Sequence, residues 1–325
     1  MKRRDFILML GAAAWPLSAQ ADQPTRRIGV LMVYPESDPE AKAWHAAFRD
    51  GLRELGWEQD RNISIEYRSA GEDRDRLRGY AAELVGLAPD VLFAAATPSL
   101  VALHRETRSI PIVFVQTSDP VKLGLVKSLA RPGGNVTGFT NFEHSMGGKW
   151  LALIKETVPS TLRVAVISDP NNAANSPYLE AIEAAAPTLE VSLTRLDVRD
   201  ASEIEYAIGA FAQEAKGALI VLPNVPTMLH RDLIIGLAAH HRLPAVYPYR
   251  AFTSAGGFIS YGIDLAEEYR RAASYVDRIL KGAKPGDLPI QQPDKFELII
   301  NLKTAKALGL TIPQSFLLHV DEAIE

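Results

Sequence analysis

The 325-residue sequence contains no cysteine, so disulfides, thiolate nucleophiles and cysteine-based zinc or iron–sulfur sites are excluded. It also lacks G-x-S-x-G, H-E-x-x-H and a P-loop, the motifs that commonly carry nucleophile, metal and phosphate chemistry. The PGGN stretch near residue 133 lacks the G-x-G-x-x-G spacing of a dinucleotide loop. We therefore expect no catalytic residue, no metal site and no cofactor.

Strong charge of either sign is also missing. The formal net charge is -4, the pI is about 6.0 and no basic stripe is present, which argues against a nucleic-acid partner. With 47% hydrophobic and 23% charged residues and a mean hydropathy of -0.02, the composition is that of a globular protein. The chain is long enough for two hydrophobic cores, so two domains are expected.

The N-terminus combines a basic start with a short apolar stretch. KRRDFILMLGAAAWPLSAQA is apolar from Phe6 to about Ala19 and ends in a small-x-small cleavage site. This pattern predicts a signal peptide over residues 1–21, because the apolar part is shorter than the roughly 20 residues that span a bilayer. The Arg3-Arg4 pair followed by x-Phe-Ile is typical of a twin-arginine signal, and a general secretory signal is the alternative.

The missing cysteine also bears on location. A bacterial lipoprotein needs a cysteine directly after its signal to carry the lipid, and this sequence has none. We therefore expect an exported protein that is soluble and not lipid-anchored, located in the periplasm.

Short apolar runs alternate with amphipathic helical stretches through the rest of the chain. Residues 27–33 lead into a helix whose Trp44, Phe48 and Leu52 recur every four residues. Such alternation predicts parallel sheets covered by helices on both faces. The pattern pauses at residues 131–143, which are rich in Gly, Asn and Thr, and then restarts. Two α/β sheets joined by more than one crossing indicate a hinged protein with two lobes.

Polar turns follow the predicted strands, as in QTSDPVKLG, residues 116–124, after the apolar run at 110–115. Because the carboxyl ends of parallel strands lie on one edge of a sheet, these residues are expected to face a ligand. In the first lobe they are Tyr34, Thr97, Gln116, Ser118 and Asp119. In the second lobe they are Asp169, Asn175, Ser176, Asn224, Tyr247 and Tyr249, with Tyr261 near another strand end. Helix capping and turn formation explain the Thr, Ser, Asp and Asn residues equally well, and the tyrosines fit half-buried surfaces.

The run DPVKLGLVKSLARPGGNVTG, the Thr97-Pro98 turn and the ending FELIINLKTAKALGLTIP resemble one family closely. They are similar to ABC-transporter substrate-binding proteins related to the tryptophan/tyrosine transport receptors. The resemblance implies a type I periplasmic-binding fold, with two Rossmann-like lobes with parallel sheets joined by a three-segment hinge. We expect lobe 1 at 26–140 plus 265–285 and lobe 2 at 141–264 plus 286–325. The crossings are expected near 139–142, 261–265 and 285–294.

The resemblance also implies site residues. The ligand positions of the family correspond to Thr97, Ser118, Asp119, Thr140, Asn175, Ser176 and Asn224. The sequence has Ser118 where aromatic amino-acid receptors usually have Thr, and Pro223 where an Asp usually precedes the Asn. The expected ligand is therefore an amino acid or an aromatic or carboxylate compound.

The implied function is a solute receptor of an ABC importer. A monomer would capture a small molecule in the interlobe cleft by hinge closure and deliver it to the membrane permease with its ATPase. A ligand-sensing receptor that acts on a signalling partner uses the same clamp and remains an alternative. An exported enzyme is the other alternative, because the twin-arginine route often carries folded cofactor proteins.

Overall fold

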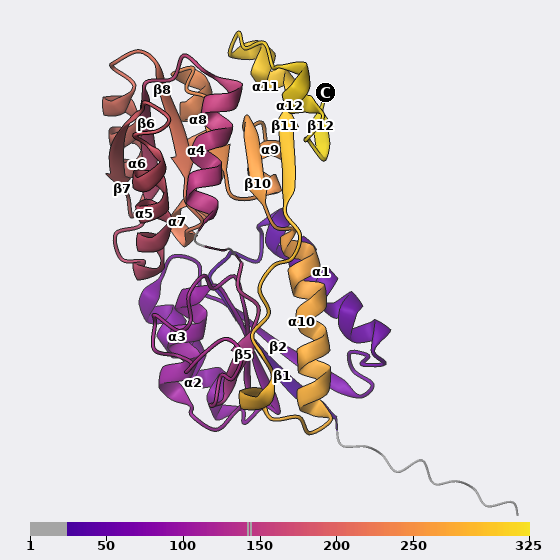
Figure 1. Ribbon diagram of the computed structural model, residues 1–325. Coiled ribbons are helices and arrows are strands. Elements are labelled where there is room, and N and C mark those ends of the chain that lie inside the picture. Colours follow the sequence, from indigo (N-terminus) through magenta and orange to yellow (C-terminus); the bar gives the residue numbers. More distant parts are fainter. Residues whose placement is uncertain (1–24, 142, 144) are drawn as a thin grey trace, which may run out of the picture.

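The computed structural model describes residues 25–141, 143 and 145–325 (Figure 1). The predicted signal peptide at residues 1–21 lies outside the described residues, as does residue 142 of the first predicted crossing. Within the described residues the strands form two separate sheets. The lower and upper lobes of Figure 1 each contain one of them.

In the described part of the chain, the first sheet has five strands in the order β2-β1-β3-β4-β5, all parallel. They are β1 (Arg26–Met32), β2 (Ile63–Ser69), β3 (Val91–Ala95), β4 (Ile112–Val115) and β5 (Val136–Gly138). Strands β3, β4 and β5 are buried throughout, as expected for parallel strands covered on both faces.

Helices cover both faces of this sheet. They are α1 (Pro39–Glu54), α2 (Arg74–Gly86), α3 (Thr97–Glu106) and, from far along the chain, α10 (Leu265–Leu280). Helix α10 lies against α1 in the lower lobe (Figure 1). The approach is close, because a Cβ on Gly51 of α1 would lie 2.7 Å from the backbone oxygen of Arg270. Helix α10 therefore returns the chain to the first lobe.

The described strands of the second sheet follow the order β12-β11-β10-β9-β8-β6-β7. They are β6 (Arg163–Ser168), β7 (Ser192–Asp197), β8 (Gly217–Val221), β9 (Ala245–Tyr247), β10 (Ile259–Gly262), β11 (Glu297–Asn301) and β12 (Glu322–Ile324). Strand β11 runs antiparallel to β10, and the other pairs are parallel. The predicted fold class is confirmed, with one antiparallel pair in an otherwise parallel second sheet.

The helices of the second lobe follow the same alternation. They are α4 (Met146–Thr157), α5 (Ser176–Ala185), α6 (Ala201–Phe211), α7 (Val225–Leu229), α8 (Arg231–His240), α9 (Arg250–Ser254), α11 (Leu302–Ala307) and α12 (Gln314–Leu317). Two short 3-10 turns complete the described elements, at Ala173–Asn175 and Pro285–Asp287. None of the described helices is long and apolar enough to cross a membrane.

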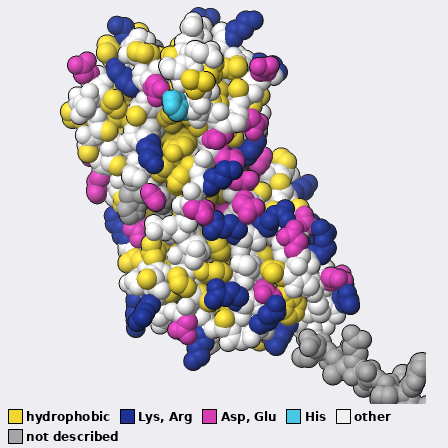
Figure 2. All heavy atoms as spheres, turned by 45° about the vertical axis from the view of Figure 1, so that its right-hand side comes forward, with side chains coloured by type: hydrophobic (Ala, Val, Ile, Leu, Met, Phe, Trp, Pro, Cys, Tyr) yellow, Lys and Arg dark blue, Asp and Glu magenta, His cyan; other side chains and the backbone are white. Residues whose placement is uncertain are grey.

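Two of the segments that connect the lobes are hydrogen-bonded to each other. Gln291 N–H donates to the Gly138 oxygen at 3.0 Å, and Thr140 N–H donates to the Gln291 oxygen at 2.9 Å. Acidic and basic side chains gather at this junction of the lobes (Figure 2), where Arg271 pairs with Asp294 at 3.1 Å. The two connecting segments are thus hydrogen-bonded to each other, an arrangement that suits a hinge.

Gly138 at the end of β5 allows this arrangement. Its φ is +155°, and a Cβ there would lie 2.1 Å from the Phe114 oxygen. We expect Gly138→Ala to lower the free energy of unfolding by about 2–4 kcal/mol, because backbone would have to move. Urea denaturation measures this change.

The matched control for this variant is Gly79→Ala. Gly79 is exposed in α2, and no other group lies within 4 Å of the position that a Cβ would take there. Alanine is the better helix former, so this control is expected to stabilise the protein by about 0.5–1 kcal/mol. Equal urea midpoints for Gly138→Ala and the wild type would contradict the role of Gly138.

Candidate functional site

A cavity of about 410 Å³ lies where the carboxyl ends of strands from both sheets meet. Its first-lobe residues include ones that follow β1, β2, β3 and β4, and its second-lobe residues include ones that follow β6, β8 and β9. Seven of the residues expected to face a ligand line it: Tyr34, Thr97, Gln116, Ser118, Asp169, Asn224 and Tyr249. A site of this volume suits a small organic molecule. Sequence reasoning therefore located this edge of both sheets.

Two strand exits in the first lobe have backbone conformations that are uncommon for residues other than glycine. Ala96 after β3 has φ 70° and ψ 157°, and Gln116 after β4 has φ 57°. Both residues line the cavity. Such conformations cost free energy and concentrate at binding and catalytic sites. They turn the chain sharply here, so that α3 begins directly at the cavity.

Gln116 also supplies a free donor. Its side chain is 6% exposed, and the hydroxyl of Tyr269 lies 3.5 Å from its Oε1 atom. Its Nε2 atom has no hydrogen-bond partner among the described residues. An unpaired buried amide is costly, so a ligand acceptor at this point would be stabilising.

Three asparagines interlock the loops of the second lobe. The Oδ1 atom of Asn224 accepts from Asn172 Nδ2 at 2.8 Å and from Asn175 Nδ2 at 2.9 Å. Asn175 also donates to the Asp169 backbone oxygen at 3.1 Å. We call Asn172, Asn175 and Asn224 the asparagine cluster. Asn172 and Asn224 line the cavity, whereas Asn175 lies behind them and supports them.

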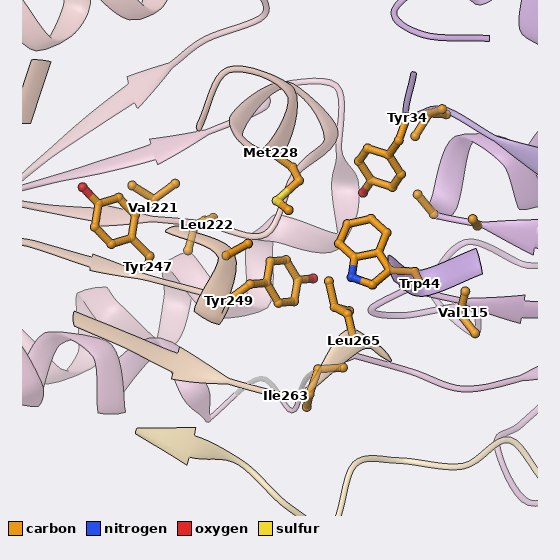
Figure 3. Close-up of a cluster of buried hydrophobic side chains, with 14 of the residues drawn as sticks. Tyr34, Trp44, Val115, Val221, Leu222, Met228, Tyr247, Tyr249, Ile263 and Leu265 are labelled. Atoms are coloured by element: carbon orange, nitrogen blue, oxygen red, sulfur yellow. The ribbon is translucent and has the colours of Figure 1, made fainter. Parts of the chain in front are cut away.

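A second hydrogen-bonded chain runs across the cleft. Ser118 Oγ donates to Asn141 Oδ1 at 3.0 Å, and Asn141 Nδ2 donates to the Tyr249 hydroxyl at 2.9 Å. Figure 3 shows this hydroxyl directed toward the first lobe, where the rings of Tyr34 and Trp44 pack edge to face at 5.2 Å. Burial raises the pKa of Tyr249 well above its usual range, so it stays a neutral phenol. This wall of the cavity is thus polar and uncharged.

Four other predicted residues lie outside the cavity lining, each with a local role. Asp119 accepts from the Lys122 backbone N–H at 2.9 Å, as a cap does. Thr140 donates to the Gln291 oxygen at 3.2 Å in the crossing and lines a separate cavity behind the hinge. Ser176 is the first residue of α5 and is half-buried. Asn175 belongs to the asparagine cluster.

Two predicted tyrosines also lie away from the cavity. Tyr247 is 1% exposed and stacks on Phe252 at 4.9 Å. In Figure 3 its hydroxyl is directed away from Tyr34 and Trp44. Tyr261 packs on Phe296 at 5.9 Å in the second lobe. Both rings are used for packing within that lobe, whereas Tyr34 and Tyr249 reach the cleft.

Several lining residues were not predicted. Asn141 is in a connecting segment without regular structure and Asn172 caps the 3-10 turn at Ala173–Asn175, and loop and cap positions explain asparagine sufficiently. Arg74, Arg78 and Arg105 line the cavity from α2 and α3. In sequence they look like the other exposed arginines of amphipathic helices, and only the contact between the two helices brings them together.

Polar side chains of the two lobes also approach each other outside the cavity lining. Arg231 Nη1 of the second lobe lies 2.6 Å from Asp38 Oδ2 of the first, and the two side chains are only 11% and 12% exposed. Nearby, His230 Nε2 lies 2.9 Å from Glu72 Oε1. Asp38 also caps α1 through its Oδ1 atom, which accepts from Glu40 N–H at 2.8 Å. These contacts hold the lobes together on one side of the cavity.

A buried carboxyl lies behind the cavity. Glu268 of α10 is 5% exposed, and neither of its side-chain oxygens has a hydrogen-bond partner among the described residues. Burial raises the pKa of Glu268 from 4.5 to about 8, while the nearby Gln116 backbone N–H and Arg271 lower that pKa by less. Glu268 is therefore mostly protonated at neutral pH. No group of three or more His, Asp or Glu that could hold a metal occurs in the part of the chain that the structure describes.

Two facing α/β sheets with a polar cleft between their strand ends define a bilobal ligand-binding protein. The sequence profile of the family described as ABC transporter substrate binding protein matches residues 29–324. The chain therefore belongs to this family, and the resemblance seen in the sequence is confirmed.

Known relatives share most of the length. A "Tyrosine-binding protein" of Clostridioides difficile (strain R20291) is 26% identical over 287 residues, which cover 88% of this chain and 81% of that protein. The crystal structure of a conserved domain protein from Vibrio cholerae is 29% identical, with a TM-score of 0.86, and covers 92% of this chain and 99% of the other. An ABC domain from Streptococcus pneumoniae in complex with L-Trp is 25% identical, also with a TM-score of 0.86, over 92% and 100% of the two chains.

The Glu268 carboxyl makes stability depend on pH. Because the native carboxyl holds its proton more tightly than the unfolded one, its contribution to stability is complete below about pH 4.5 and is lost as pH rises through about 8. We expect Glu268→Gln to raise the free energy of unfolding at pH 8.5 by about 1–3 kcal/mol and to change it little at pH 4.5. Urea denaturation at the two pH values is the measurement.

The control for this experiment is Glu267→Gln, which removes an exposed carboxylate from the same helix. Its effect should be small at both pH values, because exposed ion pairs such as Glu267 with Arg270 contribute little. If the free energy of unfolding of Glu268→Gln depended on pH as that of the wild type does, Glu268 would be ionised at neutral pH.

Proposed function

We propose that the chain is the solute receptor of an ABC importer in the periplasm. It captures a small organic solute in the interlobe cleft, closes around it and presents it to a membrane permease that works with an ATPase. The observation that carries this proposal is the 410 Å³ cavity, which both lobes line at their strand ends. Export by the predicted signal at residues 1–21, through the twin-arginine or the general secretory route, belongs to the same proposal.

The polar groups of the cavity favour a ligand with a carboxylate or similar head. The free Gln116 amide and the Thr97 hydroxyl of the first lobe offer neutral donors, and the neutral amides of Asn172 and Asn224 line the opposite side. The N-terminus of α3 adds backbone N–H groups and partial positive charge, which suit an anion. The rings of Tyr34 and Tyr249 and the apolar side chains of the wall suit an apolar or aromatic body. An aromatic amino acid meets both requirements, in keeping with the tyrosine and tryptophan of the relatives' names.

Hinge closure is the second part of the proposal. We assign residues 26–140 plus 265–285 to lobe 1 and residues 141–264 plus 286–325 to lobe 2, with crossings near 139–142, 261–265 and 285–294. The contacts between Arg231 and Asp38 and between His230 and Glu72 connect groups that an open cleft would separate. The similarity in overall shape to a domain in complex with L-Trp supports a closed arrangement. Closure would bury the ligand between donors from both lobes.

The ligand class is tested by calorimetry against aromatic and aliphatic amino acids, aromatic carboxylates and sugars. We expect an aromatic amino acid or aromatic carboxylate to bind most tightly. Asn224→Ala should weaken its binding roughly 5- to 150-fold, because it removes a cavity-lining amide and releases the loop that Asn172 and Asn175 hold in place, and one lost ligand hydrogen bond costs about 1–3 kcal/mol.

Gln213→Ala is a suitable control, because Gln213 is an exposed amide of the second lobe outside the cavity. The Gln213→Ala variant should bind the ligand with the same affinity as the wild type. Tight binding of a sugar and of no carboxylate would overturn the proposed ligand class. Undiminished affinity in Asn224→Ala would place the site elsewhere.

A further inference from the structure

The cavity is longer than the interlobe cleft alone. Beyond the strand ends it extends over neighbouring faces of α2 and α3, two helices that pack side by side in the lower lobe (Figure 1). These residues form what we call the helical arm of the cavity: Arg74, Leu77 and Arg78 on α2, and Pro98, Val101, Ala102 and Arg105 on α3.

The side chains of the helical arm change from polar to apolar to cationic along α3. Thr97 and Arg105 both line the cavity and are eight residues apart on α3, a rise of roughly 12 Å. On α3, Val101 and Ala102 lie between Thr97 and Arg105 and present apolar surface, to which Leu77 of α2 adds. A ligand that fills the cavity would therefore pass from neutral hydrogen-bond donors, over an apolar wall, to cationic groups.

The charges of the arm are not balanced by its surroundings. Arg78 pairs with Asp75, and Arg76, which is outside the cavity, lies 3.5 Å from Asp73. Arg74 and Arg105 have no carboxylate partner among the described residues, although the chain as a whole has a net charge of -4. The one carboxylate in the described lining is Asp169 of the opposite lobe, which accepts from the Asn171 N–H at 2.8 Å.

We propose that the helical arm is a second subsite, in which Arg105 binds an anionic group at the far end of the ligand. This inference rests on the proposed function and narrows its ligand class to solutes with a polar head, an apolar body and a distal carboxylate or phosphate. Guanidinium groups suit both anions, because their planar N–H donors match two oxygens at once. The arm thus acts as a determinant of specificity.

The test uses two pairs of ligands that differ only in a distal anion. The pairs are L-tyrosine with O-phospho-L-tyrosine, and L-phenylalanine with 4-carboxy-L-phenylalanine, so one pair reports on phosphate and the other on carboxylate. Calorimetry compares the wild type with Arg74→Gln, Arg105→Gln and the control Arg76→Gln, which is on the same helix as Arg74 but outside the cavity.

We expect the wild type to bind the anionic member of at least one pair about 3- to 10-fold more tightly than its neutral partner, a modest factor because the arginines are exposed. Arg105→Gln should reduce this preference more than Arg74→Gln does, because Arg74 opens α2 at the cleft edge, and Arg105→Gln should lower the affinity for the anionic member more than the affinity for the neutral one. Arg76→Gln should retain the preference, and a salt concentration of about 0.5 M should weaken it.

The outcomes separate this inference from the proposed function. Binding of the neutral members without any preference for an anion would overturn the subsite and leave the receptor function intact. Binding of none of the four compounds would overturn both the aromatic ligand class and the subsite. Unchanged binding in the arginine variants, combined with reduced uptake of the solute by cells, would assign Arg74 and Arg105 to a surface for the permease and contradict the subsite.

Discussion

Among the described ion pairs between the lobes, that of Asp38 with Arg231 is the most buried, and the arrangement of the two lobes brings its charges together. Its two charges come from different lobes, lie 2.6 Å apart and are almost completely buried. Opening the cleft would hydrate both groups, so the desolvation cost and the attraction nearly offset each other. Such a pair fixes how the two lobes meet but contributes little net free energy to that arrangement. Because Asp38 also caps α1, the ion pair connects α1 of the first lobe to the junction of α7 and α8 in the second.

The cleft itself follows from the need to satisfy polar groups at strand ends. In the second lobe the asparagine cluster satisfies its own donors and acceptors, and this fixes the positions of two loops. In the first lobe the Gln116 amide is left with a donor unpaired, next to the uncommon backbone of Ala96. The second-lobe side of the cleft is therefore held by its own hydrogen bonds, whereas the first-lobe side has an unpaired donor on Gln116. A ligand that pairs with Gln116 would join the two sides.

The sequence predicted the fold well because its signals were local and repeated. Apolar runs and the periodic apolar residues of α1 indicated the alternation of strands and helices, and the direction of parallel strands indicated the edge at which the cleft lies. The site was predicted less completely. Tyr247 and Tyr261 follow the same pattern as Tyr34 and Tyr249, but the direction in which a ring points depends on packing against Phe252 and Phe296. Arg74 and Arg105 line one cavity only because α2 and α3 pack together, which no spacing in the sequence reveals.

Closure of two lobes around a solute is the central claim, and small-angle X-ray scattering tests it most directly. The radius of gyration of the protein should fall when its tightest ligand is added to saturation. Asp38→Asn keeps an amide oxygen that can cap α1 but removes the charge that pairs with Arg231. Its ligand-free form should have a larger radius of gyration than the wild type if the pair favours closure. A radius of gyration that is the same with and without saturating ligand, in both proteins, would contradict the account.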